Sequence, residues 1–540
     1  MARHYLLTAT CALAAELLLV LGGCGSEQLT ETSDSTGPAT DGSLGSSGTS
    51  ETHAATGEPT TGAPGTAEES EESSTHVDTS ADPSGGSIDS ATTESSTGEP
   101  SVCGDGVPAQ DEGCDDANLV DFDGCSAACR IELAATRVWV GGGTACAAFE
   151  DASLRCWGGG VIGTNGSESM NSIGDDPGEM GGGLEPLDLG TGFLVDQIRD
   201  AACARSGTQV KCWGQGTWLG QGVSENVGDA PGEMGDALAT VSLDGDTSWL
   251  GDYCAHLEGG LKCWGGNAWG GLGLGDTESR GDEPGEMGEN LPFVDLGAVG
   301  TLVDQCNGSG YRCALDDAGA MKCWGLNDRG MLGTEDYENR GDEPGEMGDA
   351  LEPVDLGTDA YASQIACGRT TVCALLDDAG LRCWGSNDQG ELVDVFGDIF
   401  GGTWGGQPNQ MGDDLPEIVP DPDRTVAEVD VGYDVVCVRF DDGAVKCWGN
   451  NAAGALGQGN EMWSGGVESS AAELPIIDLG TNEAAEQIAV GEGFTCARLV
   501  GGRVKCWGEN HVGQLGYEDT EDRGDEPGEM GDALPYVLFF

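Results

Sequence analysis

The stretch QIAVGEGFTCARLVGGRVKCWGENHVGQLG, residues 487–516, contains the pattern that decides the fold. Its segments are short, alternate between apolar and polar residues, and are separated by glycine-rich turns, which is typical of β-strands joined by hairpins. The element "Cys, about nine residues, Cys-Trp-Gly" occurs seven times, with Trp at positions 157, 213, 264, 324, 384, 448 and 507. Successive Trp residues are 56, 51, 60, 60, 64 and 59 positions apart. This period predicts a chain of seven similar β-units.

The two cysteines of each unit flank a predicted hairpin turn, such as Asp317-Ala318-Gly319. Folding back at that turn places them opposite each other on antiparallel strands, close enough for a disulfide. Zinc is the competing interpretation, but each hairpin offers only two thiols, so we favour disulfides. The predicted pairs are Cys146 with Cys156, Cys203 with Cys212, Cys254 with Cys263, Cys313 with Cys323, Cys373 with Cys383, Cys437 with Cys447, and Cys496 with Cys506. Cys306 and Cys367 predict a further bridge between neighbouring units.

The repeat is best preserved at Gly491–Gly516, at Gly449–Gly457 and in WGLNDRGMLG at 324–333. It resembles the regulator of chromosome condensation repeat, with cysteines added on the facing strands. The resemblance covers residues 134–540 and implies an all-β fold, a seven-bladed β-propeller with one blade-equivalent per repeat. It also implies that each Trp of the Cys-Trp-Gly element packs between blades.

Seven segments resemble LPFVDLG, one after each Cys-Trp-Gly element, and the last is LPYVLFF at 534–540. Each predicts a further strand. If this strand belongs to the following blade, the last residues of the chain complete the first blade and close the ring. If it belongs to the preceding blade, no such closure is needed. The sequence leaves both alternatives open.

The N-terminus predicts export and anchoring. Residues 1–23 are expected to form a lipoprotein signal peptide, because their apolar run is too short for a comfortable transmembrane span. Leu21-Gly22-Gly23-Cys24 resembles a bacterial lipobox, in which Cys24 is lipidated. Residues 25–101 have almost no large apolar residue to bury, so we predict a disordered linker. The expected location is the outer membrane or cell surface, held by the lipid, with plain secretion as the alternative.

A small cysteine-rich module is predicted at 102–131. Four cysteines in so short a segment predict two disulfides among Cys103, Cys114, Cys125 and Cys129, with the pairing open. The segment resembles the cysteine-rich repeat of myxobacterial surface proteins and, more distantly, the calcium-binding Lin-Notch repeats. Oxygen ligands for calcium would come from Asp115, Asp116, Asn118, Asp121 and Asp123. The alternative is that these are solvated turn residues. No other cofactor is expected.

The chain has 95 acidic and 22 basic residues, a formal charge of −73, so phosphate backbones repel it and nucleic acid is not an expected partner. The namesake of the repeat family binds chromatin and acts on a small nuclear GTPase, and we expect neither role here. A bacterial relative of the same architecture is a secreted β-lactamase inhibitor, so the resemblance implies that the propeller can bind proteins. Fold alone does not carry function.

Catalytic motifs are scarce in the repeat region, which has two histidines, His256 and His511. A Ser-His-Asp triad would depend on one of them, and His256 stands at a variable strand position where we expect an exposed side chain. We therefore predict a monomeric, non-catalytic module that binds an extracellular or envelope protein or glycan. The alternative is an extracellular hydrolase or a secreted enzyme inhibitor.

The sequence RGDEPGEMGD at 340–349 recurs with small changes in most units. Its Arg is present in three copies only, so we interpret the motif as a turn of the repeat rather than an adhesion signal. Its Met is expected to fill a gap between strands. Calcium binding by the neighbouring acids is the competing hypothesis. The Met occupies one register, at Met180, Met234, Met287, Met347, Met411 and Met530.

Overall fold

Seven small antiparallel sheets make up the part of the chain that the computed structural model describes, namely residues 114, 125, 130–199, 202–393, 402–462 and 470–540. We number them blades 1–7 in chain order. Their strands are β1 (Ala135–Gly141), β2 (Thr144–Phe149), β3 (Leu154–Gly158); β4 (Gln197–Arg199), β5 (Cys203–Ser206), β6 (Gln209–Cys212); β7 (Trp249–Gly251), β8 (Cys254–Leu257), β9 (Gly260–Cys263); β10 (Leu302–Asn307), β11 (Tyr311–Asp316), β12 (Met321–Gly325); β13 (Ala362–Cys367), β14 (Thr371–Leu376), β15 (Leu381–Ser386), β16 (Thr403–Trp404); β17 (Val426–Val431), β18 (Val435–Phe440), β19 (Val445–Gly449); and β20 (Ala485–Val490), β21 (Phe494–Leu499), β22 (Val504–Gly508).

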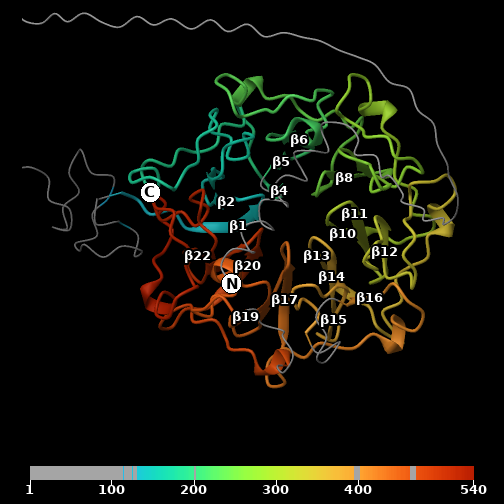
Figure 1. Cartoon of the computed structure of the whole chain (residues 1–540). Helices are drawn as coiled ribbons and strands as arrows, with labels where there is room; N and C mark the ends of the chain where they lie inside the picture. The colour runs from blue at the N-terminus through green and yellow to red at the C-terminus, as the bar shows by residue number, and fades with distance from the viewer. Residues whose placement is uncertain (1–113, 115–124, 126–129, 200–201, 394–401, 463–469) are drawn as a thin grey trace, which may run out of the picture. The chain divides into compact units, whose positions relative to one another are not determined.

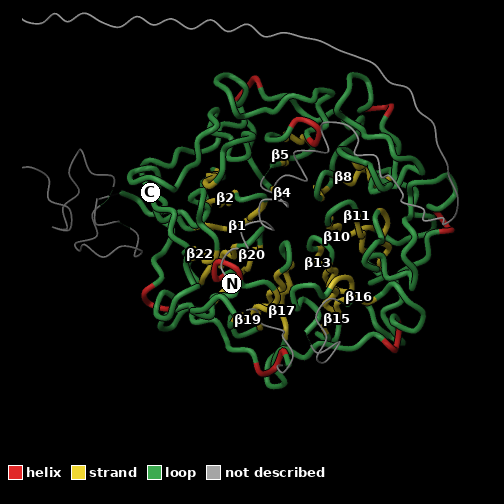
Figure 2. Tube along the Cα trace, viewed as in Figure 1, coloured by secondary structure: helices red, strands yellow, loops and turns green. Residues whose placement is uncertain are grey.

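Loops contribute much of the rest of this all-β fold, as Figure 2 shows. Within the described residues the helical elements are 3₁₀ turns of three residues each, at Gly216–Trp218, Gly235–Ala237, Gly288–Asn290, Gly348–Ala350, Gly412–Asp414, Ala452–Gly454, Ala471–Glu473 and Gly531–Ala533. In the same residues we find no helix with the length and apolar character needed to cross a bilayer.

The blades follow one another around a common centre, and their first strands face inward (Figure 1). Three pairs of neighbouring blades are joined by a backbone hydrogen bond from the start of one first strand to the hairpin of the blade before. Ala362 N donates to Gly319 O at 3.0 Å, and Ala485 N donates to Gly443 O at 2.9 Å. Ala135 N donates in the same way to Gly502 O at 2.9 Å, so blade 1 closes onto blade 7 by the bond that joins consecutive blades.

The LPxVDLG segments pair with the third strand of their own blade. Leu187 N donates to Leu154 O at 2.7 Å in blade 1, and Val537 N donates to Val504 O at 2.9 Å in blade 7. Of the two alternatives left open by the sequence, this is the one in which the segment belongs to the preceding blade. The chain end still crosses to blade 1, because Leu133 N donates to Phe539 O at 3.2 Å and the Phe539 ring meets that of Phe149 at 4.9 Å.

Each hairpin carries a disulfide between directly opposed cysteines. Cys146 faces Cys156 and Cys313 faces Cys323 in the strand register, and the Cα–Cα distance is 4.1 Å in all seven pairs. Cys306 on β10 is bridged to Cys367 on β13, which links blades 4 and 5. Cys114 is bridged to Cys125, whereas Cys103 and Cys129 lie outside the described residues.

The Trp of each Cys-Trp-Gly element is completely buried between blades, as the resemblance implied. Its indole N–H donates to a backbone carbonyl in the blade before: Trp324 Nε1 to Gly271 O at 2.9 Å, and Trp384 Nε1 to Met331 O at 2.8 Å. The series of indole bonds runs around the whole ring, since Trp157 Nε1 of blade 1 donates to Gln514 O of blade 7 at 3.0 Å. An interface that buries an aromatic ring and satisfies its polar atom holds adjacent blades in one geometry.

The RGDEPGEMGD loop is a self-contained turn. Glu346 Oε2 accepts hydrogen bonds from Gly341 N at 2.9 Å and Glu343 N at 3.0 Å, while Arg340 forms an ion pair with Asp336 at 2.6 Å. The Met of each copy lies in the same buried apolar cluster as the Trp of its own unit, so the packing prediction is confirmed. The acid of the motif therefore serves backbone N–H groups of its own turn.

Candidate functional site

A cavity of about 330 Å³ lies where the first strands of six blades meet, and blade 3 contributes Asp252, which directly follows its first strand. In its wall, glutamine side chains at equivalent positions bridge one first strand to the first strand of the next blade. Gln364 Nε2 donates to Val429 O at 3.0 Å, and its Oε1 accepts from Val429 N at 3.2 Å. Gln487 makes the same pair of bonds to Val138, at 2.7 and 3.1 Å. These amides occupy strand-edge groups that would otherwise be unpaired, and so they fix the wall.

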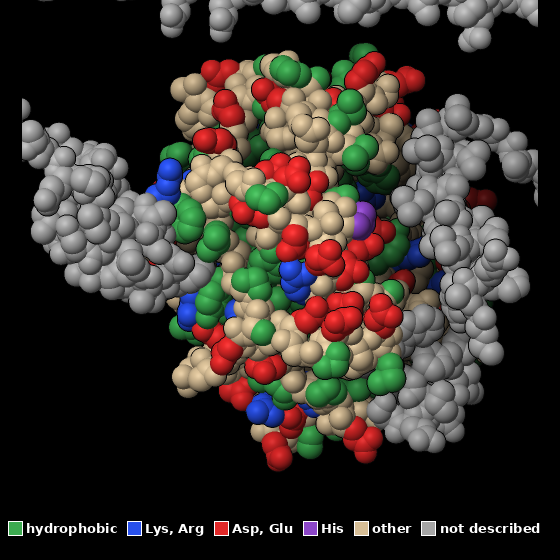
Figure 3. Space-filling model, turned by 60° about the vertical axis from the view of Figure 1, so that its left-hand side comes forward, with side chains coloured by type: hydrophobic (Ala, Val, Ile, Leu, Met, Phe, Trp, Pro, Cys, Tyr) green, Lys and Arg blue, Asp and Glu red, His purple; other side chains and the backbone are tan. Residues whose placement is uncertain are grey.

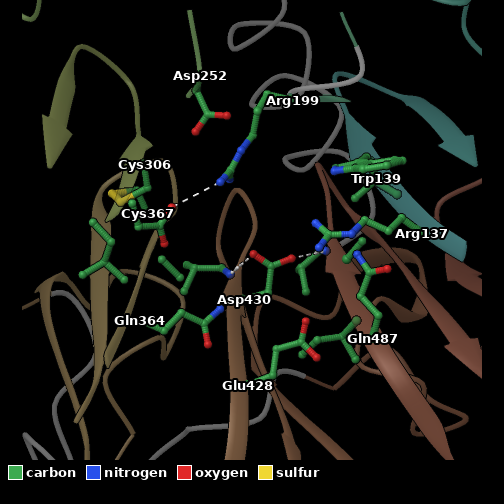
Figure 4. A pocket seen from close by; sticks show the side chains of 18 of the residues that line it. Arg137, Trp139, Arg199, Asp252, Cys306, Gln364, Cys367, Glu428, Asp430 and Gln487 are labelled. Carbon is green, nitrogen blue, oxygen red and sulfur yellow. Dashed lines mark hydrogen bonds and ion pairs between the residues drawn. A yellow bond between two sulfur atoms is a disulfide. The ribbon is translucent and has the colours of Figure 1, made fainter. Parts of the chain in front are cut away.

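One wall position changes chemistry from blade to blade. It is the residue paired with the first cysteine of each hairpin, and around the ring it is Trp139, Arg199, Gly251, Cys306, Ala366, Asp430 and Ala489. The backbone position is equivalent in every blade, whereas the side chains include an indole, a guanidinium, a disulfide sulfur and a carboxylate. Figure 4 shows several of them around the same space. A site at this position is therefore formed by side chains from several blades rather than by one blade.

The wall of the cavity contains buried charges. Arg199 Nη2 lies 3.2 Å from Asp304 Oδ1. Asp430 accepts from Val490 N at 2.8 Å and from Val431 N at 3.0 Å, and burial raises the pKa of Asp430 to about 7. Burial also raises the pKa of Asp252, against the opposing charge of Arg199. A carboxyl group with a pKa near neutrality gains from any new hydrogen-bond donor that reaches it.

Gln305 is a polar residue at a position that is aliphatic in the other blades. It is fully buried and lines the cavity, and its Oε1 accepts from Asp252 N at 2.7 Å. Its Nε2 donates to no protein acceptor. A buried donor without a partner is costly, so this amide is a polar defect in the wall rather than a group that a ligand in the cavity can touch.

The described residues contain one group of side chains with the spacing of a three-ligand metal site. Among the described residues, the one group of His, Cys, Asp and Glu atoms close enough to share an ion is Cys306, Cys313 and Cys367, and all three sulfurs are in disulfides. None of the described cavity carboxylates belongs to such a group of three. The calcium ligands predicted from the sequence, Asp115, Asp116, Asn118, Asp121 and Asp123, lie outside the described residues, as does Cys24.

His256 is half-buried, so the prediction of an exposed side chain is wrong. Its ring is stacked on Trp249 with a centroid distance of 5.4 Å, and Nδ1 lies 2.7 Å from Ser248 Oγ. The Ser248 hydroxyl also lies 2.9 Å from the His256 carbonyl, to which it donates. The Ser248 hydroxyl thus has two partners on His256, and the imidazole tautomer decides which atom donates between Oγ and Nδ1. His511 lies 3.0 Å from Glu509 on the surface.

Sequence reasoning missed the cavity, although the repeat contains a signal for it. In five of the seven blades the variable wall residue stands seven positions before the first cysteine of the hairpin, as Asp430 does before Cys437. Aligning the units on that cysteine would have brought Trp139, Cys306 and Asp430 to one position. Glu391 was also missed; it is buried away from the cavity, and burial raises its pKa to about 8.

Comparison with known proteins agrees with this fold. Residues 362–391 and 485–514 match the family model described as Regulator of chromosome condensation (RCC1) repeat, so the chain is a β-propeller that contains repeats of this family. Residues 96–130 match a model described as Domain of unknown function (DUF4215), which overlaps the predicted cysteine-rich module.

Two curated relatives illustrate the range of proteins with similar sequences. The ultraviolet-B receptor UVR8 of Arabidopsis thaliana is 25% identical over 329 residues, which are 60% of this chain and 66% of the receptor. The probable E3 ubiquitin-protein ligase HERC6 of Homo sapiens is 26% identical over 263 residues, which are 48% of this chain and 23% of the ligase. The chain thus spans about a quarter of that ligase. The activities of these whole proteins do not pass to this chain through the repeats.

Among solved structures, yeast RCC1 (Prp20) bound to Kap60 aligns over 74% of each chain with 15% identity and a TM-score of 0.38. Human WBSCR16 aligns over 74% of this chain and 80% of its own, with 17% identity and a TM-score of 0.41. At these values the likeness adds nothing to the fold already described.

Proposed function

We propose that this protein is a surface-anchored bacterial lipoprotein whose disulfide-stapled propeller binds an extracellular or envelope protein or glycan without catalysing a reaction. The observation that carries the proposal is the wall position opposite the first hairpin cysteine, where a repeated scaffold presents a different side chain in nearly every blade. Selection for packing alone would favour one residue type at equivalent positions. Variation at this position, on an otherwise regular ring, is expected of a surface that recognises a ligand.

Rigidity supports binding in particular. Seven hairpin disulfides, the Cys306–Cys367 bridge and the cyclic indole bonds fix the strands that carry the wall. A preorganised site loses little conformational entropy when a ligand binds. The acids of the wall are engaged by Arg199 or by backbone N–H groups, which suits them to hold a ligand rather than to shuttle protons.

The surface charge is compatible with an exported protein that stays soluble at the cell surface. The chain carries a formal charge of −73, and Figure 3 shows acidic side chains spread over the face in view. Such a surface disfavours non-specific adhesion to anionic lipids and nucleic acids. Lipid attachment at Cys24 would hold the protein to its membrane while residues 25–101 act as a tether.

Binding is tested with the full chain as bait against purified envelope proteins and an array of surface glycans. We expect at least one partner that binds saturably and that stays bound and chemically intact during prolonged incubation. Progressive breakdown of a glycan or peptide by the purified chain would instead establish the hydrolase alternative. The absence of any saturable partner would contradict the proposal.

Anchoring is tested separately, by labelling with radioactive palmitate in a bacterial host that processes lipoproteins. We expect the label on the wild-type chain and on Cys11→Ala, and none on Cys24→Ala. Cys11→Ala is the matched control because it lies within the same predicted signal peptide. Equal labelling of Cys24→Ala and the wild type would contradict the lipobox assignment.

A further inference from the structure

Two of the acids that line the central cavity are paired with arginines. Arg199 is paired with Asp304 at 3.2 Å, and Glu428 is paired with Arg439 at 2.7 Å. The other charged residues of the wall are Asp252, Asp430 and Arg137. Because the pKa of Asp430 is about 7, this carboxyl group is only partly ionised at neutral pH. The lining has two arginines and four acids, and the pairing of Glu428 with Arg439 and the partial ionisation of Asp430 reduce its negative charge, so the wall does not favour an anionic ligand.

The wall nevertheless offers many hydrogen-bonding groups of both kinds. Asp252 and Asp430 present carboxylate oxygens that accept, and the exposed guanidinium of Arg137 donates. Donors and acceptors that alternate around one space match a ligand whose groups can do both. Hydroxyl groups have this property, since each donates one hydrogen bond and accepts others.

Trp139 is the one aromatic residue among the described residues that line the cavity. It is half-buried, and Figure 4 shows it beside Arg137. An indole offers a flat apolar face on which the C–H groups of a saturated ring can pack. An apolar face beside planar polar groups suits a ring that is apolar on one side and hydroxylated at its edge.

We infer that the central cavity binds a neutral sugar residue, packed on Trp139 and hydrogen-bonded by Asp252, Asp430 and Arg137. This inference rests on the proposed binding function and chooses a glycan over a protein as the ligand of the cavity. The volume of about 330 Å³ is at the lower end of small-molecule sites, so the cavity takes one or two sugar rings rather than a long segment of polymer.

Saturation-transfer difference NMR on the full chain tests this, with glucose, galactose, N-acetylglucosamine and cellobiose as neutral probes and spermidine as a cationic probe. We expect saturation transfer to at least one sugar, strongest at the C–H groups of one ring face. The Kd should rise about tenfold or more in Trp139→Leu and in Asp252→Asn, because each loses a direct contact. The matched controls Trp269→Leu and Asp423→Asn alter exposed residues outside the cavity and should leave the Kd unchanged.

The variants are first compared with the wild type by near-ultraviolet circular dichroism and Tm; if Trp139→Leu is not native, Asp252→Asn carries the test. Saturation transfer to spermidine but to no sugar would overturn the inference in favour of a cationic ligand. Sugar binding that both cavity variants leave intact would also overturn it. If the full chain retains an envelope protein in the array experiment while no sugar binds, this inference fails and the proposed function stands. If neither a protein nor a glycan is retained, both fail.

Discussion

In every blade the first and the third strand flank the same second strand, yet their sequences vary to very different degrees. The third strand always contains the Cys of the Cys-Trp-Gly element, preceded by Lys or Arg. That cation is largely buried and holds loop carbonyls: Lys322 Nζ donates to Leu296 O at 2.8 Å and Gly348 O at 3.2 Å, and Lys505 makes the equivalent bonds to Leu479 and Gly531. The first strand has no such constant residue opposite the first cysteine.

The difference separates the residues that build the ring from the residues that the ring presents. A third-strand residue meets the same surroundings seven times, because each blade packs on an equivalent neighbour. The residues opposite the first cysteine lie beside the central cavity, and their surroundings differ: Cys306, Ala366 and Ala489 belong to apolar clusters, whereas Arg199 and Asp430 are charged residues of the cavity wall. The comparison therefore predicts large stability effects at the third strand and small ones where the repeat already tolerates variation.

The largest effect is expected at the buried indoles. Trp324→Ala removes a completely buried side chain and its bond to Gly271 O, and should lower the free energy of unfolding by about 3–5 kcal/mol. Denaturant unfolding followed by circular dichroism measures it. Trp269→Ala, at an indole that is 40% exposed, is the control and should cost much less. Equal losses in the two variants would remove the distinction between scaffold and surface.

A smaller effect, of opposite sign, is expected at Glu391. This buried acid stands where blade 7 has Gln514, and burial raises its pKa to about 8 from an ordinary value of 4.5. Since the pKa of Glu391 is higher in the folded state, its contribution to the free energy of unfolding is greatest below pH 4.5 and declines as the pH rises toward 8. Glu391→Gln should be of the order of 2 kcal/mol more stable than the wild type at pH 8 and equal to it near pH 4.

Urea titrations of both proteins at the two pH values measure this difference. Glu343→Gln, at an exposed acid, is the control and should behave as the wild type at both. A difference of the same size at pH 4 would mean that the substitution acts through packing rather than through the charge.

How much of this the sequence could predict depends on how far apart the interacting residues lie in the chain. The hairpin disulfides follow from a spacing of nine or ten residues around one turn, so a single unit contains all that is needed. The cavity requires seven first strands, each about 60 residues from the next, and it exists only once the ring has closed. Composition and motif searches do not see such a site.

Closure itself illustrates the limit. The sequence left open which blade the LPxVDLG strand joins, because both alternatives place apolar residues inward. The bond from Val537 N to Val504 O decides for the preceding blade, while Phe539 still packs against Phe149 of blade 1. An apolar tail can serve both blades, and local patterning cannot distinguish the two partners.

The acidic loop gives a prediction of about 1 kcal/mol. Glu346→Ala removes the acceptor of two backbone N–H groups and should cost about 1–2 kcal/mol, whereas Glu346→Gln should cost less than about 0.5 kcal/mol. Blade 5 already contains the second arrangement, since Gln410 Oε1 accepts from Gly405 N at 3.0 Å and Gln407 N at 2.9 Å. Tm measurements with and without EDTA accompany the series, and an EDTA-dependent fall in the Tm of the wild type that Glu346→Gln abolishes would restore calcium to this loop.

The smallest effect is expected at the arginine of the RGD tripeptide. Arg340→Val removes the ion pair with Asp336. Both side chains of this pair are in contact with solvent, so the free energy of unfolding should change by no more than about 0.5 kcal/mol. Blades 1 and 2 carry Ile173 and Val227 at this place, and each makes the same backbone bridge to the glycine of its Cys-Trp-Gly element. Arg312→Met is the contrasting control, because that guanidinium is buried and donates to Gly271 O at 2.6 Å. If Arg340→Val costs as much as Arg312→Met in urea unfolding, the arginine is part of the scaffold and its absence from the first two blades needs another explanation.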